Sequence, residues 1–463
     1  MKYFQSLIAC CVPFIGLSAL EAKEKDTNVD RPNIILIMSD QHTANAMSCA
    51  GNPYVKTPGI DQLAQDGIRF ERSYVTYPLS GPSRASLITG KMPVQLGVKD
   101  NSVGDISAEE LASSIGNVVN KAGYECLYAG KWHAPLSINL PEKGTGFTNV
   151  ADMDDRVLVE KSKAYLEKKH KKPIFYVASF LNPHETCEFA RDEALHYGPL
   201  NVDTDADRAL YPPLPINASI PPFYPEAVML HREFVPKSYP TKNYTDTDWQ
   251  RYLYAYYRFV ERVDNEVLKL IKLLKDNDLY DNSLIIFTSD HGDGVAAHRA
   301  NQKRVPQEEI AGVPFIVKPP NSKGLNLVNS EALVSVNLDI YKTVCDYANA
   351  KYSDDGRFGM SLRPVVEGRT GKHHDAVFVE TFLDGVNTRA WTIIENQYKY
   401  TLYRFYKNKE QLIDFKTDPL EMQNLAPVGG YADVKKGIRE KLKLWGERID
   451  DEMLVTAVTE NDL

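Results

Sequence analysis

Short apolar runs that lead into polar residues are the feature that most limits the fold of this chain. They lie at residues 34–38, 126–129, 174–180, 284–288 and 314–317. Unbroken apolar runs of this length are typical of parallel strands that are buried on both faces of a sheet. Helical patterns occur between them, at residues 57–64, 108–121 and 249–275. The alternation predicts an α/β fold with a mostly parallel central sheet flanked by helices.

The sequence changes character twice outside this alternation. Residues 188–248 are rich in proline and tyrosine and lack clear periodicity, which predicts an irregular insertion that forms a lid or part of a substrate cleft. Near the C-terminus, strand-like runs precede a charged helical pattern, at residues 376–381, 391–394, 398–403 and 432–448. We therefore expect a catalytic domain over residues 23–365 and a smaller C-terminal α+β subdomain over residues 366–463.

Residues 1–22 have the organisation of a signal peptide. A basic Lys2 precedes an apolar run over residues 7–20, and small residues near Ala22 suit cleavage. We expect export to the periplasm. The sequence LIAC at 7–10 is similar to a lipoprotein signal, but few apolar residues precede it, so we place a lipid-anchored surface protein second. Nothing else approaches the about 20 apolar residues of a membrane helix, so we expect no transmembrane segment in the mature chain.

Composition argues against two kinds of protein. The chain carries 54 basic and 62 acidic residues, a net charge of −8, without a long run of one sign. We therefore expect no nucleic-acid partner. The cysteines beyond the predicted signal peptide are Cys49, Cys126, Cys187 and Cys345. They show no metal-binding spacing, and a chain this long needs no disulfide framework, so we expect free thiols.

Metal-ligand residues follow two predicted strands that are far apart in sequence. Asp40 and Gln41 follow the first strand, and Asp290 and His291 follow the strand at 284–288. Because parallel strands present ligands at one edge of a sheet, we expect these four side chains to meet. Their carboxylate, amide and imidazole groups suit a divalent cation. Taken singly, each aspartate could instead cap the following helix.

Further basic and imidazole groups follow the same strands. They are Lys131 and His133 after the second run, His184 after the third, and His298 and Lys303 after the fourth. A lone surface lysine or histidine is more often a solvated group than a catalyst. The shared position at strand ends is what predicts a single polar cleft.

The most specific motif reads SGPSRASLITGK, over residues 80–91. Its pattern, Ser-x-Pro-Ser-Arg followed by Leu-x-Thr-Gly-Lys, resembles the signature of the type I sulfatases of the alkaline phosphatase superfamily. Ser80 resembles the first signature position of the serine-type bacterial branch. Further blocks that resemble the family are RPN at 31–33, GKWH at 130–133, NPH at 182–184, SDHGD at 289–293 and IDFKTDPLE at 413–421. The resemblance spans roughly residues 31–426.

The resemblance implies a nucleophile and a metal. In this family the first signature residue is oxidised to formylglycine, so Ser80 is implied to be the precursor of the nucleophile. A serine-type sulfatase-maturating enzyme is then an implied partner. The implied ligands of calcium, with magnesium as the other candidate ion, are Asp40, Gln41, Asp290 and His291.

The resemblance also implies roles for the groups around the nucleophile. Arg84 and Lys131 would steady the formylglycine and sulfate oxygens. His133 would act as a base, while His184 and Lys303 would contact the sulfate and protonate the leaving oxygen. His298, close in sequence to this set, is an expected substrate contact.

The implied function is an exported sulfatase that acts on sulfated carbohydrates such as glycosaminoglycan or mucin fragments. Two other functions stay open. One is a phosphomonoesterase or phosphodiesterase of the same superfamily, which shares the strand-end ligands. The other is a non-catalytic glycan-binding protein in which Ser80 is unmodified. Additional sugar contacts are expected from the 188–248 insertion and from His373, His374, Asp384, Asn387 and Arg389.

Overall fold

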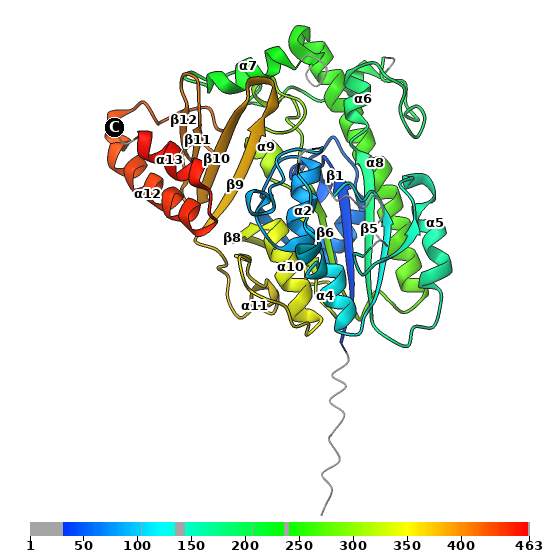
Figure 1. Cartoon of the computed structure of the whole chain (residues 1–463). Helices are drawn as coiled ribbons and strands as arrows, with labels where there is room; N and C mark the ends of the chain where they lie inside the picture. Colours follow the sequence, from blue (N-terminus) through cyan, green and yellow to red (C-terminus); the bar gives the residue numbers. More distant parts are fainter. Residues whose placement is uncertain (1–30, 103, 135–143, 206, 236–239, 462–463) are drawn as a thin grey trace, which may run out of the picture. The chain divides into compact units, whose positions relative to one another are not determined.

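The structure, a computed structural model, describes residues 31–102, 104–134, 144–205, 207–235 and 240–461. The segment Pro32–Leu463 forms one compact unit (Figure 1). The predicted signal peptide lies outside the described residues. Among the helices that are described, none is long and apolar enough to cross a membrane.

An eight-stranded sheet forms the centre of this unit (Figure 1). Its strands are β1 (Asn33–Asp40), β2 (Ile68–Tyr74), β3 (Glu125–Gly130), β4 (Thr148–Ala151), β5 (Ile174–Pro183), β6 (Ser283–Ser289), β7 (Phe315–Lys318) and β8 (Leu327–Ser335). They lie in the order β4-β3-β5-β1-β6-β7-β2-β8. β7 runs antiparallel to both neighbours, and the other paired strands of this sheet run parallel. The predicted mostly parallel sheet is confirmed.

Apolar layers on both faces of the sheet explain why β1 is apolar at successive positions. Ile34, Leu36 and Met38 belong to one hydrophobic cluster, and Ile35 and Ile37 belong to the other. The first cluster includes residues of α2 (Ser80–Thr89), α4 (Ile115–Lys121) and α10 (Val336–Tyr347). The second includes residues of α1 (Pro58–Asp66), α5 (Asp155–Leu166) and α8 (Asp246–Asp276). Helices therefore flank the sheet on both sides, as the apolar runs predict.

A smaller antiparallel sheet lies in the C-terminal part of the chain. Its strands are β9 (Ala376–Leu383), β10 (Thr388–Glu395), β11 (Tyr398–Tyr403) and β12 (Glu410–Asp414), in the order β12-β11-β10-β9. The helices α12 (Ala432–Arg448) and α13 (Glu452–Asn461) follow. Trp445 of α12 stacks on Phe378 of β9, with the ring centroids 4.1 Å apart. The predicted smaller α+β subdomain is thus confirmed.

Some elements differ from the expectation. The helix predicted over residues 108–121 is two helices, α3 (Ala108–Ala112) and α4, because Ser114 is extended and its hydroxyl donates to the Thr145 carbonyl. The 188–248 insertion is mostly irregular, as predicted, but it contains α7 (Glu226–Phe234). Strands β2 and β8 escape prediction because charged and exposed residues interrupt their apolar pattern.

The carboxyl ends of β1, β3, β5 and β6 lie at one edge of the central sheet. β1 pairs in parallel with β5 on one side and with β6 on the other, where Ser39 lies opposite Ser289. β3 pairs with β5 so that Gly130 lies opposite Ser179. This register brings the residues that follow all four strands to the same edge, where open α/β sheets hold their ligands.

Candidate active site

A compact acidic and imidazole cluster occupies this edge of the sheet. Its members are Asp40 at the end of β1, and Asp290 and His291 directly after β6. Ligand atoms of the three side chains lie within 4.8 Å of one another. His291 Nε2 lies 3.8 Å from Asp40 Oδ1 and 3.8 Å from Asp290 Oδ1, and all three residues are buried.

Ser80, the first residue of α2, faces this cluster. Its hydroxyl lies 3.2 Å from Asp40 Oδ2 and 3.0 Å from His291 Nε2. His291 Nδ1 lies 2.9 Å from the Gly292 carbonyl, which can only accept, so Nδ1 carries the ring proton. Burial and Lys303 lower the pKa of His291 to about 3, so the ring is neutral. Its Nε2 therefore directs a lone pair at Ser80 and the carboxylates.

Basic side chains surround the two carboxylates. Arg84 Nε lies 2.8 Å from Asp290 Oδ2, and Arg84 Nη2 lies 3.2 Å from Asp40 Oδ2. Lys131 Nζ lies 2.6 Å from the same oxygen of Asp40. The guanidinium is fixed further because its Nη1 donates to the Lys131 carbonyl at 2.7 Å and to Ser179 Oγ at 2.8 Å. Arg84 and Lys131 are thus held at one edge of the cluster with their charges unable to reach bulk water.

Electrostatics favour ionised carboxylates in the cluster. Burial alone would raise the pKa of Asp40, but the charges of Lys131 and Arg84 hold it well below its usual range. Burial and the neighbouring Asp40 charge raise the pKa of Asp290 to about 6, against the attraction of Arg84. For Arg84, the attraction of Asp290 and Asp40 outweighs the effect of burial and raises its pKa. Charged partners therefore outweigh burial at Asp40 and Arg84 but only partly offset it at Asp290.

The cluster has the chemistry of a cation site. Asp40 Oδ1 is buried and, among the described residues, has no hydrogen-bond partner. Two carboxylates and an imidazole lone pair converge beside it, which is a donor set that hard or borderline divalent cations accept. A cation at this point would satisfy the orphaned oxygen and separate the two carboxylate charges. The residues present therefore fit a divalent metal.

Gln41 is oriented by its neighbours. Its Nε2 donates to Asp293 Oδ2 at 2.7 Å, and its Oε1 accepts from Lys303 Nζ at 2.9 Å and from the Cys187 thiol at 3.2 Å. Because Asp293 can only accept, the amide nitrogen faces it and the amide oxygen faces Lys303. The structure thus places Gln41 beside the cluster and joins it to Lys303.

Two histidines beside the cluster are neutral. Burial, followed by the charges of Lys303 and Lys131, lowers the pKa of His184 well below its usual range. Partial burial, with Lys131 and Arg84, lowers the pKa of His133 to about 3, although its side chain reaches the surface. Neutral imidazoles can accept a proton, so both residues have the form of a base in the free enzyme.

The family of this chain is identified by its similarity to known proteins. A family model described as Sulfatase matches residues 32–350, which is more than half of the 463 residues. A second model, described as N-sulphoglucosamine sulphohydrolase, C-terminal, matches residues 296–447. This chain belongs to the sulfatase family. It is a type I sulfatase of the alkaline phosphatase superfamily, and its activity is the hydrolysis of sulfuric esters.

Known sulfatases are similar to this chain over most of its length. The Delta 4,5-hexuronate-2-O-sulfatase of Bacteroides thetaiotaomicron is 29% identical over 90% of this chain and 88% of that relative. The N-acetylglucosamine-6-O-sulfatase of the same organism is 25% identical over 96% and 91%. A solved structure of a 2-O GAG sulfatase superposes with a TM-score of 0.79 and 27% identity, covering 91% of this chain and 93% of that one.

His298 of the sulfatase lies apart from this cluster. Its buried ring stacks on Tyr224, with the centroids 5.8 Å apart, and its carbonyl accepts from Arg232 Nη1 at 2.9 Å. These contacts give it a packing position between the insertion and the loop after β6. The expectation that it contacts substrate therefore gains no support from its position.

The residues of the C-terminal subdomain that we expect to contact sugar do not lie together. Asn387 and Arg389 line a cavity beside Tyr77, three residues before Ser80. Asp384 pairs with Arg304 at 3.4 Å. The two remaining residues, His373 and His374, meet at the buried carboxylate of Asp339. These residues thus lie in three places rather than in one sugar site.

Supporting residues of the sulfatase site were missed from the sequence. Asp293 accepts from Gln41, from the Tyr252 hydroxyl at 2.9 Å and from the Gln302 backbone at 3.0 Å. It lies in the SDHGD block, so its position after the predicted metal ligands was a usable signal. Ser179 lies within a buried apolar strand, and its contact with Arg84 depends on the pairing of β3 with β5. No sequence pattern marks such a residue.

Proposed function

We propose that this sulfatase is an exported enzyme that removes sulfate esters from saccharides, such as glycosaminoglycan or mucin fragments. It uses formylglycine made from Ser80 and a bound divalent cation, with calcium the first candidate and magnesium the second. One observation carries the proposal: Ser80 Oγ lies 3.2 Å from Asp40 and 3.0 Å from His291, at the metal-type cluster and beside Arg84 and Lys131.

The proposed modification addresses the weakness of serine as a nucleophile. Neither neighbour of Ser80 is free to act as its general base, because Asp40 is engaged by Lys131 and His291 belongs to the proposed cation site. Oxidation of the Ser80 CH₂OH group to an aldehyde removes two electrons and two protons, which the maturating oxidoreductase takes up. The hydrated aldehyde offers two hydroxyls on one carbon, so one can attack sulfur and the other can later lose its proton to release sulfate.

Burial sets the order of maturation and folding. Ser80 is 1% exposed, and Arg84 of the same motif is also buried. A maturating enzyme could not reach the Ser80 side chain in this fold. We therefore place maturation before the chain completes its folding, with export to the periplasm for the mature protein. A lipid-anchored form is the alternative, and cell fractionation distinguishes the two because an anchored protein sediments with membranes.

The cation would be held by Asp40, Asp290 and His291, with Gln41 as the further ligand. When bound, it supplies positive charge to the sulfate oxygens and to the oxygen of residue 80. Asp293 fixes which way the Gln41 amide faces, and the amide oxygen accepts from Lys303. Asp293 is then a positioning residue for the metal site.

The remaining groups bind sulfate and move protons. Arg84, Lys131 and Lys303 bring three cations to the site, and these suit a bound anion. His133 would take the proton from the second hydroxyl of hydrated residue 80. His184 and Lys303 would contact the sulfate and give a proton to the leaving oxygen.

The substrate class is supported by relatives and by a cavity. The two curated relatives described above are sulfatases named for hexuronate and N-acetylglucosamine substrates. A cavity of about 430 Å³ lies where the loop before α2 meets the C-terminal subdomain. Its lining combines aromatic and basic side chains, among them Tyr77, Lys99, Phe382, Arg389 and Phe405. Aromatic faces and cations together suit an anionic sugar.

An activity comparison tests the proposal. Chain made with a serine-type maturating enzyme should release sulfate from sulfated saccharides, whereas Ser80→Ala made in the same way should lose turnover and keep its thermal stability. Calcium should restore activity after chelation. Substantial sulfate release by Ser80→Ala would overturn the nucleophile assignment. Faster turnover of phosphate esters than of sulfate esters would favour the phosphoesterase alternative.

A further inference from the structure

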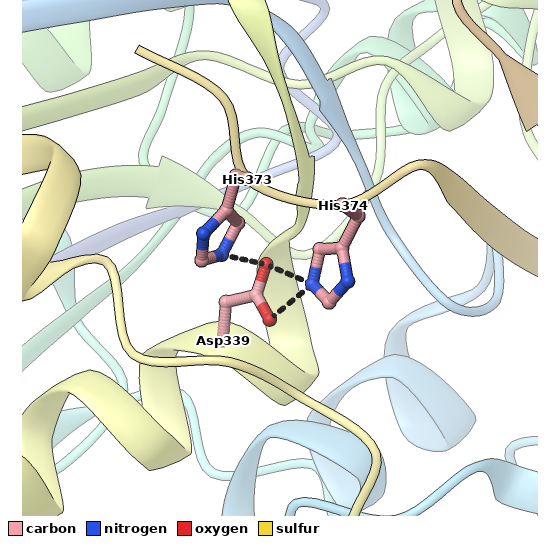
Figure 2. Close-up of side chains that lie close together, drawn as sticks. All are labelled: Asp339, His373 and His374. Carbon is pink, nitrogen blue, oxygen red and sulfur yellow. Dashed lines mark hydrogen bonds and ion pairs between the residues drawn. The ribbon is translucent and has the colours of Figure 1, made fainter. Parts of the chain in front are cut away.

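A second cluster of ligand-type side chains lies where α10 meets the segment that enters β9. Asp339 comes from the first turn of α10, and His373 and His374 precede β9. Figure 2 shows both imidazole rings turned toward the Asp339 carboxylate. His373 Nε2 lies 3.1 Å from Asp339 Oδ2, and His374 Nε2 lies 2.8 Å and 3.0 Å from Oδ1 and Oδ2. None of these residues belongs to the active-site cluster.

The carboxylate is fixed in place by backbone groups. The Ser335 N–H donates to Asp339 Oδ2 at 2.8 Å, and the Met360 N–H donates to Oδ1 at 2.8 Å. Each oxygen keeps a further lone pair, and these face the histidines. Ligands of metal sites in proteins are typically oriented by such outer contacts.

The charge on Asp339 lacks the partner that the active-site carboxylates have. Asp40 and Asp290 are each paired with arginine or lysine, whereas Asp339 is fully buried and its ion-pair partners within the described part of the chain are the two histidines. A buried carboxylate needs a compensating positive charge. A divalent cation between the three side chains would provide it, and so would a protonated His374, whose pKa the Asp339 carboxylate raises.

The spacing of the three side chains suits coordination. Their ligand atoms lie within 4.8 Å of one another, and the two rings meet edge to face at 71° with the centroids 4.6 Å apart. Tetrahedral zinc with bonds of about 2.0–2.1 Å places its ligand atoms about 3.3 Å from each other. The nitrogen-to-oxygen distances of 2.8–3.1 Å need to widen by only a few tenths of an ångström to admit the ion.

The geometry points to a zinc site formed by Asp339, His373 and His374, in addition to the cation site of the catalytic cluster. Two imidazoles and one carboxylate favour zinc over calcium or magnesium, which prefer oxygen ligands. His374 also lines a cavity of about 270 Å³ with Ser335 and Trp445, so water can supply the fourth ligand. The ion connects α10 to the segment entering β9, and so ties the central sheet to the C-terminal subdomain.

A competing arrangement has no metal. In it both histidines donate Nε2–H to Asp339, whose carboxylate then accepts from two backbone and two side-chain donors. His373→Gln and His374→Gln separate the two arrangements, because the glutamine Nε2 can still donate to Asp339 but cannot act as a zinc ligand. A purely hydrogen-bonded cluster would tolerate these changes, and a zinc site would be lost.

Zinc titration of the full-length chain tests the site. The protein is stripped with a chelator and titrated with ZnCl₂ alone, and bound zinc is counted by elemental analysis after gel filtration. Wild type should bind one more zinc than the His373→Gln/His374→Gln double variant, since zinc held at the catalytic cluster is common to both. Each single variant should weaken zinc binding at this site by on the order of 100-fold or more. Losing an outer contact costs up to about 100-fold, and each variant removes a direct ligand.

A matched control and a second readout complete the test. His196→Gln changes an exposed histidine, whose side chain is 54% exposed, and should bind zinc as wild type does. Cobalt should give wild type, but not the double variant, the intense visible absorption of four-coordinate Co²⁺ with mixed nitrogen and oxygen ligands. Equal zinc content and equal cobalt spectra in wild type and a folded double variant would overturn the site. If the double variant fails to fold, the zinc content and cobalt spectra of the folded single variants are compared with those of wild type instead.

Discussion

Individual side chains in the catalytic cluster are held by several partners at once. Arg84 contacts both carboxylates, a backbone carbonyl and Ser179, so its guanidinium has a single available orientation. Asp293 likewise fixes the orientation of the Gln41 amide, because it accepts the amide N–H. Such supporting contacts are made before any ligand arrives, which is what preorganised electrostatic catalysis requires.

Replacing Asp293 by asparagine should weaken the metal site. Asparagine has the same shape but presents an N–H₂ group where Gln41, Tyr252 and the Gln302 backbone all donate. We expect calcium affinity to fall by about 10–100-fold, as is usual for losing an outer-sphere partner. The measurement is activity against calcium concentration, and excess calcium should restore most of the rate. Asp278→Asn, at a turn after α8, is the control. An unchanged calcium requirement in Asp293→Asn would contradict the assigned role.

Replacing His184 by alanine should slow the chemical step. Its ring is neutral in the free enzyme, and the negative charge of bound sulfate would favour the protonated form that delivers a proton. Without this ring, kcat should fall by about 10²–10⁴-fold with a smaller change in KM. Steady-state kinetics on a sulfated sugar measures both constants. His170→Ala, whose ring pairs with Glu125 at the start of β3, the end of that strand away from Lys131, should keep wild-type kinetics. A rise in KM with kcat unchanged would move His184 to substrate binding.

At the scale of elements, the strand ends determine the site. The pairing of β3 with β5 is close at Gly130, which has a φ of +94° and where an added Cβ would lie 2.0 Å from the Ser179 carbonyl. The next residue, Lys131, donates its backbone N–H to that carbonyl at 2.8 Å. Glycine is therefore required for the turn that delivers Lys131 to Asp40.

Gly130→Ala should accordingly damage both stability and activity. Strain in the left-handed region and the clash with Ser179 together should cost about 2–5 kcal/mol of unfolding free energy. The remaining folded protein should show reduced activity, because Lys131 moves away from Asp40. Denaturant unfolding and specific activity measure the two effects. Gly429→Ala, where an added Cβ meets nothing within 4 Å, is the control. Wild-type stability for Gly130→Ala would refute this requirement.

The sequence predicted the strand ends better than the contacts between them. The apolar run at residues 34–38 and the polar residues after it identified β1 and Asp40, because a strand buried on both faces needs apolar side chains at successive positions. The half-exposed β8 carries NSE in its middle and gave no such pattern. Ser179 reaches the site through strand pairing, and Cys187 reaches it from the short helix α6 (Thr186–Ala190) after β5. One sequence without its fold does not reveal either contact.

At the scale of the whole molecule, the two sheets are joined by direct contacts. The Glu380 N–H of β9 donates to the Thr76 carbonyl at 2.9 Å, and Glu380 Oε1 accepts from the Val94 N–H at 2.7 Å. Arg304, in the active-site loop next to Lys303, donates to the Phe382 carbonyl at 3.3 Å. The C-terminal subdomain therefore supports the loops on either side of the signature helix α2.

These contacts predict cooperative unfolding of the catalytic and C-terminal parts. Differential scanning calorimetry should show a single transition for the full chain, and a chain ending at residue 365 should not fold to a stable enzyme, since Thr76, Val94 and Arg304 would lose partners. Circular dichroism of the shortened chain checks the second expectation. Two well-separated transitions, or a stable shortened chain with full activity, would contradict it.

The state of residue 80 in mature protein is the most direct test of the catalytic account. The protein is produced with a serine-type maturating enzyme, digested with trypsin, and the peptide of residues 73–84 is weighed by mass spectrometry. The account predicts a peptide lighter by two hydrogens that reacts with an aldehyde probe, in proportion to sulfatase activity. An unmodified serine in fully active protein would contradict it.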